Sequence, residues 1–197
     1  MKKLSSVLIR VGIICIILAF ILFIFIFYPV ISTEVTYQVN TLTKETKQEI
    51  KPLDSGFGIV IPKIRANAKI VANVNPYSSR EYQFALTKGV AHAKGTDYPG
   101  QEGNVFLFSH SSVNFYEASR YNSIFYLLDK MEKGDRVELY YKNEKFIYKV
   151  TDKKVVLASD VKYLENGGNG KTLVLMTCWP AGTSWKRLLI LAELDSD

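Results

Sequence analysis

In Lys171-Thr-Leu-Val-Leu-Met-Thr-Cys-Trp-Pro180, an apolar β-type run leads directly into a lone cysteine and is ended by a proline. The pattern predicts a strand with Cys178 at its end, because proline cannot continue a strand ladder. A second apolar run, Leu188 to Ala192, follows, and Arg187 stands at its head. A thiol with a cation on the neighbouring strand is typical of nucleophilic acyl transfer.

The alternative for Cys178 is an inert core side chain, since free cysteine is among the most buried residue types. Its neighbours favour a functional thiol instead. Thr177 and Trp179 are not simple core-filling residues, and Pro180 ends the strand immediately after them. Arg187 carries a charge of the kind that stabilises a thiolate or an oxyanion. Cys178 is therefore a candidate nucleophile.

Composition indicates one folded domain that follows an apolar N-terminus. The chain has 197 residues and a formal charge of +6, and its lysines are spread along the sequence rather than grouped. This argues against nucleic-acid binding, and we attribute the excess charge to a surface that faces anionic lipid or cell wall. No cysteine and histidine cluster has zinc-ligand spacing, and the carboxylates of Asp152 and Glu165 are isolated. We therefore expect no metal and no cofactor.

The N-terminal residues predict a membrane anchor. No charge occurs from 11 to 33, and this run reaches the roughly 20 residues that a bilayer span needs. Basic residues precede it, so the positive-inside rule places 1–10 in the cytoplasm, a single transmembrane helix at 11–31 and the rest outside the cell. A cleaved signal peptide is the alternative, but no small-residue cleavage site follows the run. Cys15 lies within it, so we expect no disulfide with Cys178.

Two further segments follow the predicted anchor. Residues 32–55 are polar and contain Pro52, which predicts an extracytoplasmic stalk or a short helix. Residues 56–197 contain many short β-type runs, including a hairpin around 142–145, and predict an all-β barrel or sandwich with helical insertions. We expect strands at 56–64, 68–74, 89–93, 105–109, 136–141, 146–157, 173–177 and 188–194, and helices at 79–86 and 121–130.

Acyl transfer by a thiol also needs a proton donor for the leaving amine, and the chain has two histidines. His110 follows the apolar run from Asn104 to Ser109 and so stands at a strand end, as Cys178 does. His92 lies in a weaker strand with a glycine on each side. Either could be a structural histidine, which is the commoner case. The pattern favours His110 as the partner of Cys178, with His92 as the second candidate.

A series of short motifs runs from about Gly56 to Leu194. They are Ile61-Pro-Lys-Ile64, Lys88-Gly-Val-Ala-His92, Pro99-Gly-Gln-Glu-Gly-Asn104, Ser109-His110, Gly134-Asp135, Thr172-Leu-Val-Leu-Met-Thr-Cys178 and Arg187-Leu188. In this order they resemble the motifs of the sortase family. Each motif is weak alone, whereas the Thr-Leu-x-x-x-Thr-Cys strand with an upstream histidine and a downstream Arg-Leu is a specific combination.

The resemblance implies a closed eight-stranded sortase-type β-barrel and a cysteine transpeptidase. Such an enzyme cuts a C-terminal sorting signal similar to Leu-Pro-x-Thr-Gly on secreted proteins. By position, Cys178 would attack the threonine carbonyl and form a thioacyl intermediate. His110 would protonate the leaving amine, and Arg187 would position the substrate and stabilise the oxyanion. The acceptor would be an amine, such as a cell-wall precursor or a pilin lysine, and His92 matches a non-catalytic family position.

The chain departs from the commoner family pattern at several positions. Trp179-Pro180 resembles the sortase classes with a proline after the cysteine, and Ser109-His110-Ser111 replaces the usual Gly-His-Arg. The segment between Leu157 and Lys171 joins the preceding strand to the strand that carries the cysteine. Its apolar residues are candidates to line a groove for the sorting signal; they are Val161, Tyr163 and Leu164. The equal alternative is that they pack onto the barrel as part of an ordinary loop.

Two other functions stay open from the residues alone. One is a thiol protease, in which water rather than an amine accepts the acyl group. The other is a membrane-anchored binding module that kept the barrel and lost the chemistry. The joint presence of His110, Cys178 and Arg187 argues against the binding module, because loss of activity is expected to erase at least one of them.

Overall fold

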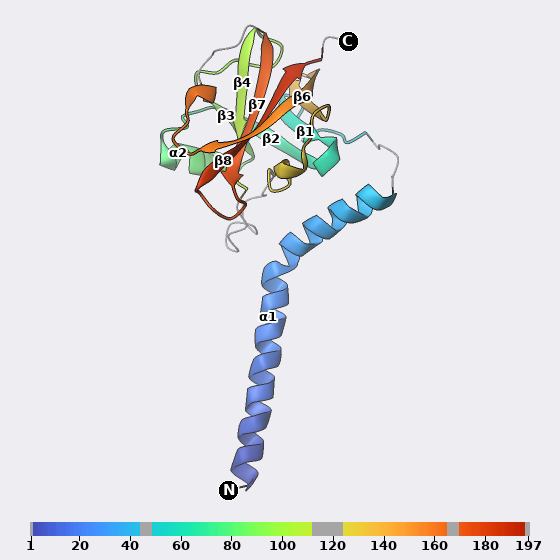
Figure 1. Cartoon of the computed structure of the whole chain (residues 1–197), viewed down its shortest axis with the longest axis vertical. Helices are drawn as coiled ribbons and strands as arrows, with labels where there is room; N and C mark the ends of the chain where they lie inside the picture. The colour runs from blue at the N-terminus through green and yellow to red at the C-terminus, as the bar shows by residue number, and fades with distance from the viewer. Residues whose placement is uncertain (1, 44–48, 112–123, 165–169, 196–197) are drawn as a thin grey trace. The chain divides into compact units, whose positions relative to one another are not determined.

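The computed structural model describes residues 2–43, 49–111, 124–164 and 170–195. The chain separates into two compact units, Met1–Glu45 and Thr46–Asp197. In the first unit a single helix, α1, runs from Lys2 to Thr43, so it includes the predicted span and the first part of the predicted stalk (Figure 1). Among the described residues, no helix has both the length and the apolar character required to cross a membrane. The anchor stays a prediction.

The second unit is a β-barrel of eight strands (Figure 1). They are β1 (Phe57–Ile61), β2 (Ala66–Val74), β3 (Val90–Ala93), β4 (Gly103–Phe108), β5 (Arg136–Tyr141), β6 (Glu144–Leu157), β7 (Lys171–Trp179) and β8 (Lys186–Leu194). The barrel closes in the order β1-β2-β3-β4-β7-β8-β6-β5. The pairs β2–β3 and β4–β7 are parallel, and the other pairs are antiparallel. The predicted closed eight-stranded barrel is confirmed.

Short helical segments decorate the barrel, and one of them differs from the prediction. The helix α2 (Ser79–Leu86) forms as expected, and 3-10 turns occur at η1 (Pro62–Ile64) and η3 (Lys162–Leu164). The predicted helix at 121–130 is wrong over its described part, where 124–127 form turns and only η2 (Leu128–Lys130) is helical. The side chains of Phe125, Leu127 and Leu128 are buried through these successive turns, and aromatic residues favour helices only weakly.

Side chains on both faces of the strands β4, β7 and β8 are buried. Inside the barrel, Leu107, Leu173 and Leu175 are completely enclosed. The alternating positions point outward because successive strand side chains face opposite sides. We call these outward residues, together with the α2 side chains that cover them, the outer cluster; it contains Val74, Ala85, Leu86, Ala91, Ala93, Phe106, Phe108, Val174 and Leu189. Burial on both faces explains the continuous apolar sequences of these strands.

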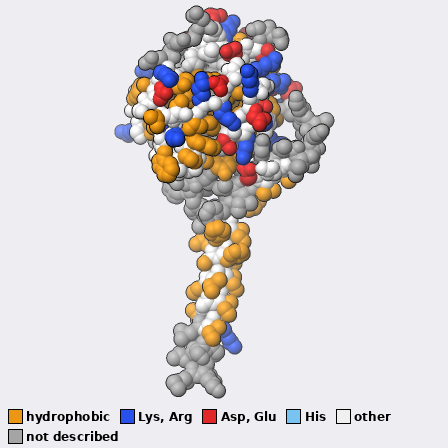
Figure 2. Space-filling view, viewed as in Figure 1, with side chains coloured by type: hydrophobic (Ala, Val, Ile, Leu, Met, Phe, Trp, Pro, Cys, Tyr) orange, Lys and Arg blue, Asp and Glu red, His pale blue; other side chains and the backbone are white. Residues whose placement is uncertain are grey.

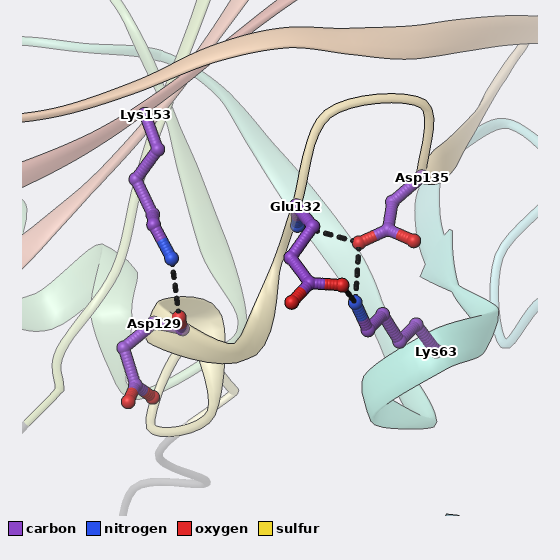
Figure 3. A network of polar contacts seen from close by, with 5 residues as sticks. All are labelled: Lys63, Asp129, Glu132, Asp135 and Lys153. Atoms are coloured by element: carbon purple, nitrogen blue, oxygen red, sulfur yellow. Dashed lines mark hydrogen bonds and ion pairs between the residues drawn. The ribbon is translucent and has the colours of Figure 1, made fainter.

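A polar network ties η1 to the loop that precedes β5 (Figure 3). The Lys63 ammonium donates to Glu132 over 2.7 Å and to Asp135 over 2.9 Å. The Lys153 ammonium on β6 donates to the carbonyl of Asp129 over 2.8 Å. Burial alone would lower the pKa of Lys63, but the two carboxylates outweigh it and hold that pKa above its ordinary value. The contacts fix the loop, although partly exposed ion pairs stabilise a fold only slightly.

Candidate active site

Strand register places Cys178 and Arg187 directly opposite each other. The strands β7 and β8 are antiparallel, and their Cα partners include Cys178 with Arg187. By alternation, Cys178 faces the same side as Val174 and Met176, and Arg187 faces the same side as Leu189. Val174 and Leu189 belong to the outer cluster, and Met176 packs against it. Both predicted site residues therefore lie on the outer face of the barrel, and each is partly buried.

His110 reaches the same edge from β4. The strand β4 runs parallel to β7, and the pairing continues past its end, because the Ser109 N–H donates to the Met176 carbonyl over 3.2 Å. The buried Thr177 hydroxyl then donates to the Ser109 carbonyl over 2.9 Å. If this register is continued, His110 lies at the level of Cys178 on the neighbouring strand. The structure thus brings the three predicted residues to one edge of three adjacent strands.

The guanidinium of Arg187 is held through only one of its three nitrogens, Nη1, by hydrogen bonds within the described residues. Its Nη1 donates to the carbonyls of Ser184, at 3.2 Å, and Lys186, at 3.0 Å. These bonds use both hydrogens of Nη1, and Nε and Nη2 carry three more N–H groups. Within the part of the chain that the structure describes, those three have no hydrogen-bond partner. A fixed guanidinium with unused donors is suited to bind a carbonyl oxygen or an oxyanion.

The hydroxyl next to the histidine is also unsatisfied. Ser111 is 2% exposed, and its Oγ has no hydrogen-bond partner within the described residues. Buried hydroxyls are nearly always paired, so an unpaired one next to His110 is unusual. The position is one where the chain departs from the commoner family pattern, and no local sequence pattern predicts that this hydroxyl is buried.

His92 occupies a different environment. It lies opposite Leu107, whose side chain points into the barrel, so His92 does not share the outer face with His110. Its Nδ1 accepts from the Asn73 N–H at 3.3 Å, and its Nε2 lies 3.0 Å from the Asp97 carbonyl. Burial lowers the pKa of His92, and the bond to Asp97 and the charge of Asp97 oppose this only partly. A buried neutral imidazole with both nitrogens occupied has a structural role.

The sequence left two roles open for the segment before β7, namely lining a groove for the sorting signal or packing onto the barrel. Tyr163 and Leu164 pack against the outer cluster, and the Tyr163 carbonyl accepts from the side-chain amide of Asn104 over 3.0 Å. Val161 instead remains 43% exposed. Part of this segment therefore covers the barrel, and residues 165–169 lie outside the described residues.

No metal-binding arrangement accompanies the site in the described ranges. Among those residues, no group of three or more histidine, cysteine, aspartate or glutamate side chains is arranged to hold an ion. The edge itself carries a thiol at the end of β7, a guanidinium on β8 and an imidazole two residues past the end of β4.

Comparison with known proteins matches this architecture to one family. A model of the sortase domain matches residues 59–195. The chain belongs to the sortase family. Sortases are cysteine transpeptidases.

Individual sortases match over most of this chain. Sortase D of Bacillus subtilis is 29% identical over 159 residues, which cover 78% of this chain and 72% of that protein. Sortase A of Streptococcus agalactiae is 26% identical, over 84% of this chain and 60% of that protein. The solved structure of sortase A from Corynebacterium diphtheriae superposes with a TM-score of 0.59 at 26% identity, over 72% and 61% of the two chains. The chain thus spans less than two thirds of these two sortases A.

Sequence reasoning missed the side chains that support the predicted sortase site. The sequence predicts Thr177 only as a neighbour of the cysteine, whereas its hydroxyl joins the ends of β4 and β7. No sequence pattern singles out Gln83 of α2, whose side-chain oxygen lies 3.2 Å from Nε2 of His110. The parallel β4–β7 pairing would have indicated the first contact. Nothing in the local sequence indicates the second, because it depends on how α2 docks.

Proposed function

We propose that this sortase is a membrane-anchored transpeptidase that cleaves a C-terminal sorting signal similar to Leu-Pro-x-Thr-Gly on secreted proteins. It would transfer the cleaved protein to an amine, such as a cell-wall precursor or a protein lysine. The observation that carries the proposal is the register that pairs Cys178 with Arg187 while β4 delivers His110 to the same edge. We assign these three residues as its catalytic residues.

In the first half-reaction the Cys178 sulfur attacks the threonine carbonyl carbon of the signal. The carbonyl oxygen gains negative charge, and the unused N–H groups of Arg187 would donate to it. The carbon–nitrogen bond to glycine then breaks, and His110 gives its proton to the departing amine. The protein is left joined to the sulfur as a thioester.

In the second half-reaction an acceptor amine attacks the thioester carbon. His110, now without its proton, takes one from the attacking nitrogen, and the sulfur leaves as the thiolate. The new amide joins the secreted protein to the acceptor. If water attacks instead, the same residues perform hydrolysis, so the identity of the acceptor decides between transpeptidase and protease.

The outer face beside the thiol offers an apolar surface for the signal. Met176 lies two residues before Cys178 on the same face, and Val156 lies opposite Arg187 across the β6–β8 pair. Both pack against the outer cluster and are partly exposed. Together with the exposed Val161 they would contact the leucine and proline of the signal, because burying apolar side chains favours binding.

The N-terminal helix supplies the proposed membrane attachment. Its residues from 11 to 33 carry no charge, and basic residues lie on its N-terminal side. The described side chains of α1 that face solvent include many large apolar residues, and Figure 2 shows them along the helix surface. The positive-inside rule then places the N-terminus in the cytoplasm and the barrel outside the cell, where sorting signals arrive.

The proposal is tested by incubating the full chain with a library of Leu-Pro-x-Thr-Gly-like peptides and a mixture of amines. We expect Cys178-dependent products in which the peptide ends at threonine and carries the amine. Products that end in a free carboxylate at every amine concentration would identify a hydrolase. Failure of the reduced, folded protein to cleave any peptide would favour the binding module.

A further inference from the structure

The helix α2 is fixed against the strand that carries His110. Its Ala85 and Leu86 are buried in the outer cluster. Its Tyr82 ring meets the Phe108 ring edge to face, with 6.3 Å between the ring centroids, two residues before the histidine. These contacts leave α2 little freedom to shift along β4, because buried side chains interlock with their neighbours.

Gln83 lies on this helix and reaches the histidine. Its Oε1 is 3.2 Å from Nε2 of His110, within hydrogen-bond distance. An amide oxygen can only accept, so His110 donates its Nε2–H in this contact. Gln83 is otherwise exposed to solvent.

We propose that Gln83 is a positioning residue that holds the His110 ring in the orientation needed to transfer protons at the thiol. The proposal rests on the transpeptidase function proposed above. Gln83 touches neither the reacting carbonyl nor the thiol in this role. It acts through the imidazole of His110, which follows the last residues of β4 and lies within hydrogen-bond distance of the Gln83 side chain.

The choice of an amide has a chemical reason. Glutamine accepts the Nε2–H without taking the proton, because an amide does not titrate in the accessible range. The ring keeps one orientation in both its neutral and its charged form, since Nε2 bears hydrogen in each. Proton transfer needs donor and acceptor within hydrogen-bond reach, so a ring that is held in place reacts more often than one that rotates.

The test uses four variants of the full chain in the peptide and amine assay. Gln83→Leu removes the acceptor, and Gln83→Lys replaces it with a donor at an exposed position that tolerates a long side chain. Gln83→Glu keeps an acceptor oxygen at the same reach. Arg80→Leu makes a matched change of an exposed α2 side chain from polar to apolar. Thermal unfolding of each variant is measured alongside kcat and KM.

We expect Gln83→Leu and Gln83→Lys to lower kcat about tenfold, with KM for the peptide unchanged within about twofold. Gln83→Glu restores most of kcat, and Arg80→Leu leaves it unchanged. Wild-type kcat in both Gln83→Leu and Gln83→Lys, a loss only in KM, or an equal loss in Arg80→Leu would overturn the proposal. If the wild type itself shows no Cys178-dependent turnover, the proposed transpeptidase function fails instead.

Discussion

At Arg187 we expect the planar, forked arrangement of N–H donors to matter as much as the positive charge. The guanidinium is held through Nη1 by the carbonyls of Ser184 and Lys186 while its other donors remain available. Lysine has a single ammonium group and cannot bind these carbonyls and a substrate oxygen with separate nitrogens. We expect Arg187→Lys to lower kcat/KM on the order of 100-fold, the usual cost of losing an oxyanion donor. The matched control is Lys186→Arg on the same strand. Activity of Arg187→Lys within about twofold of the wild type would rule out a directed role for the guanidinium.

At His92 we expect an effect on stability rather than on catalysis. Its pKa is lowered in the folded protein, chiefly by burial, so the unfolded chain binds the proton more readily. The histidine therefore stabilises the fold fully above its ordinary pKa of 6.5, and this contribution decreases as the pH falls below that value towards the lowered folded pKa.

Urea unfolding at a series of pH values measures this directly. The wild type should lose stability as the pH falls below about 6.5, and the loss should be smaller in His92→Gln. The variant should keep a wild-type pH profile of transpeptidation once it is folded. A pH–rate profile that changes with His92 while His110→Gln remains active would reverse the roles that we assign to the two histidines.

At the scale of the elements, the start of β4 depends on a glycine. Gly103 has a φ of 120°, and a side-chain carbon there would lie 2.2 Å from the Asp97 carboxylate. That carboxylate accepts the Asn104 N–H over 3.1 Å and so helps begin the strand. We expect Gly103→Ala to lower the free energy of unfolding by about 1–3 kcal/mol.

Denaturant unfolding of Gly103→Ala gives the cost, with Gly134→Ala as the comparison. Gly134 also has a positive φ, of 91°, but a side-chain carbon there meets no atom within 4 Å. The difference between the two variants therefore isolates the clash with Asp97 from the backbone strain. Equal stability losses in both variants would show that the Asp97 contact contributes nothing.

Most strands were predictable because their residues favour an extended backbone locally and are also buried in the folded barrel. The apolar runs of β4, β7 and β8 are buried on both faces, so their sequences show the strands without knowledge of the fold. The β5–β6 hairpin was predictable for a local reason as well. Its two loop residues, Lys142 and Asn143, have φ values of 52° and 67°, as a tight hairpin turn requires.

The parts that could not be predicted depend on docking between distant segments. Residues 124–130 form turns and η2, and their apolar composition alone did not distinguish turns from a helix. Cys178, Arg187 and His110 could be chosen by their strand ends, but pairing Cys178 with Arg187 needs the register of β7 and β8. Gln83 is 27 positions from His110 and is brought to it only by the packing of α2.

At the scale of the whole molecule, the barrel should fold without the helix. The two units, Met1–Glu45 and Thr46–Asp197, are separately compact, and the barrel closes on itself without a strand from the first unit. We expect a protein that comprises residues 46–197 to unfold cooperatively. In cells, the full chain should resist extraction from membranes with alkaline carbonate, whereas the shortened protein should not.

Comparing the two proteins tests separately whether the barrel folds without α1 and whether α1 attaches the protein to the membrane. A shortened protein without a cooperative unfolding transition would show that the barrel depends on α1. Extraction of the full chain by carbonate would contradict the proposed anchor, whatever the stability of the barrel. The shortened protein retained by membranes would point to attachment through the barrel surface instead.

The proposed function requires Cys178 to carry the acyl group. Intact-protein mass spectrometry of the full chain, quenched with acid during turnover of a cleaved peptide, tests it most directly. We predict a mass increase equal to the peptide up to its threonine, located on Cys178 by proteolysis, discharged by added amine and absent in Cys178→Ala. An adduct that forms equally in Cys178→Ala, or peptide cleavage that persists in that variant, would rule out Cys178 as the nucleophile.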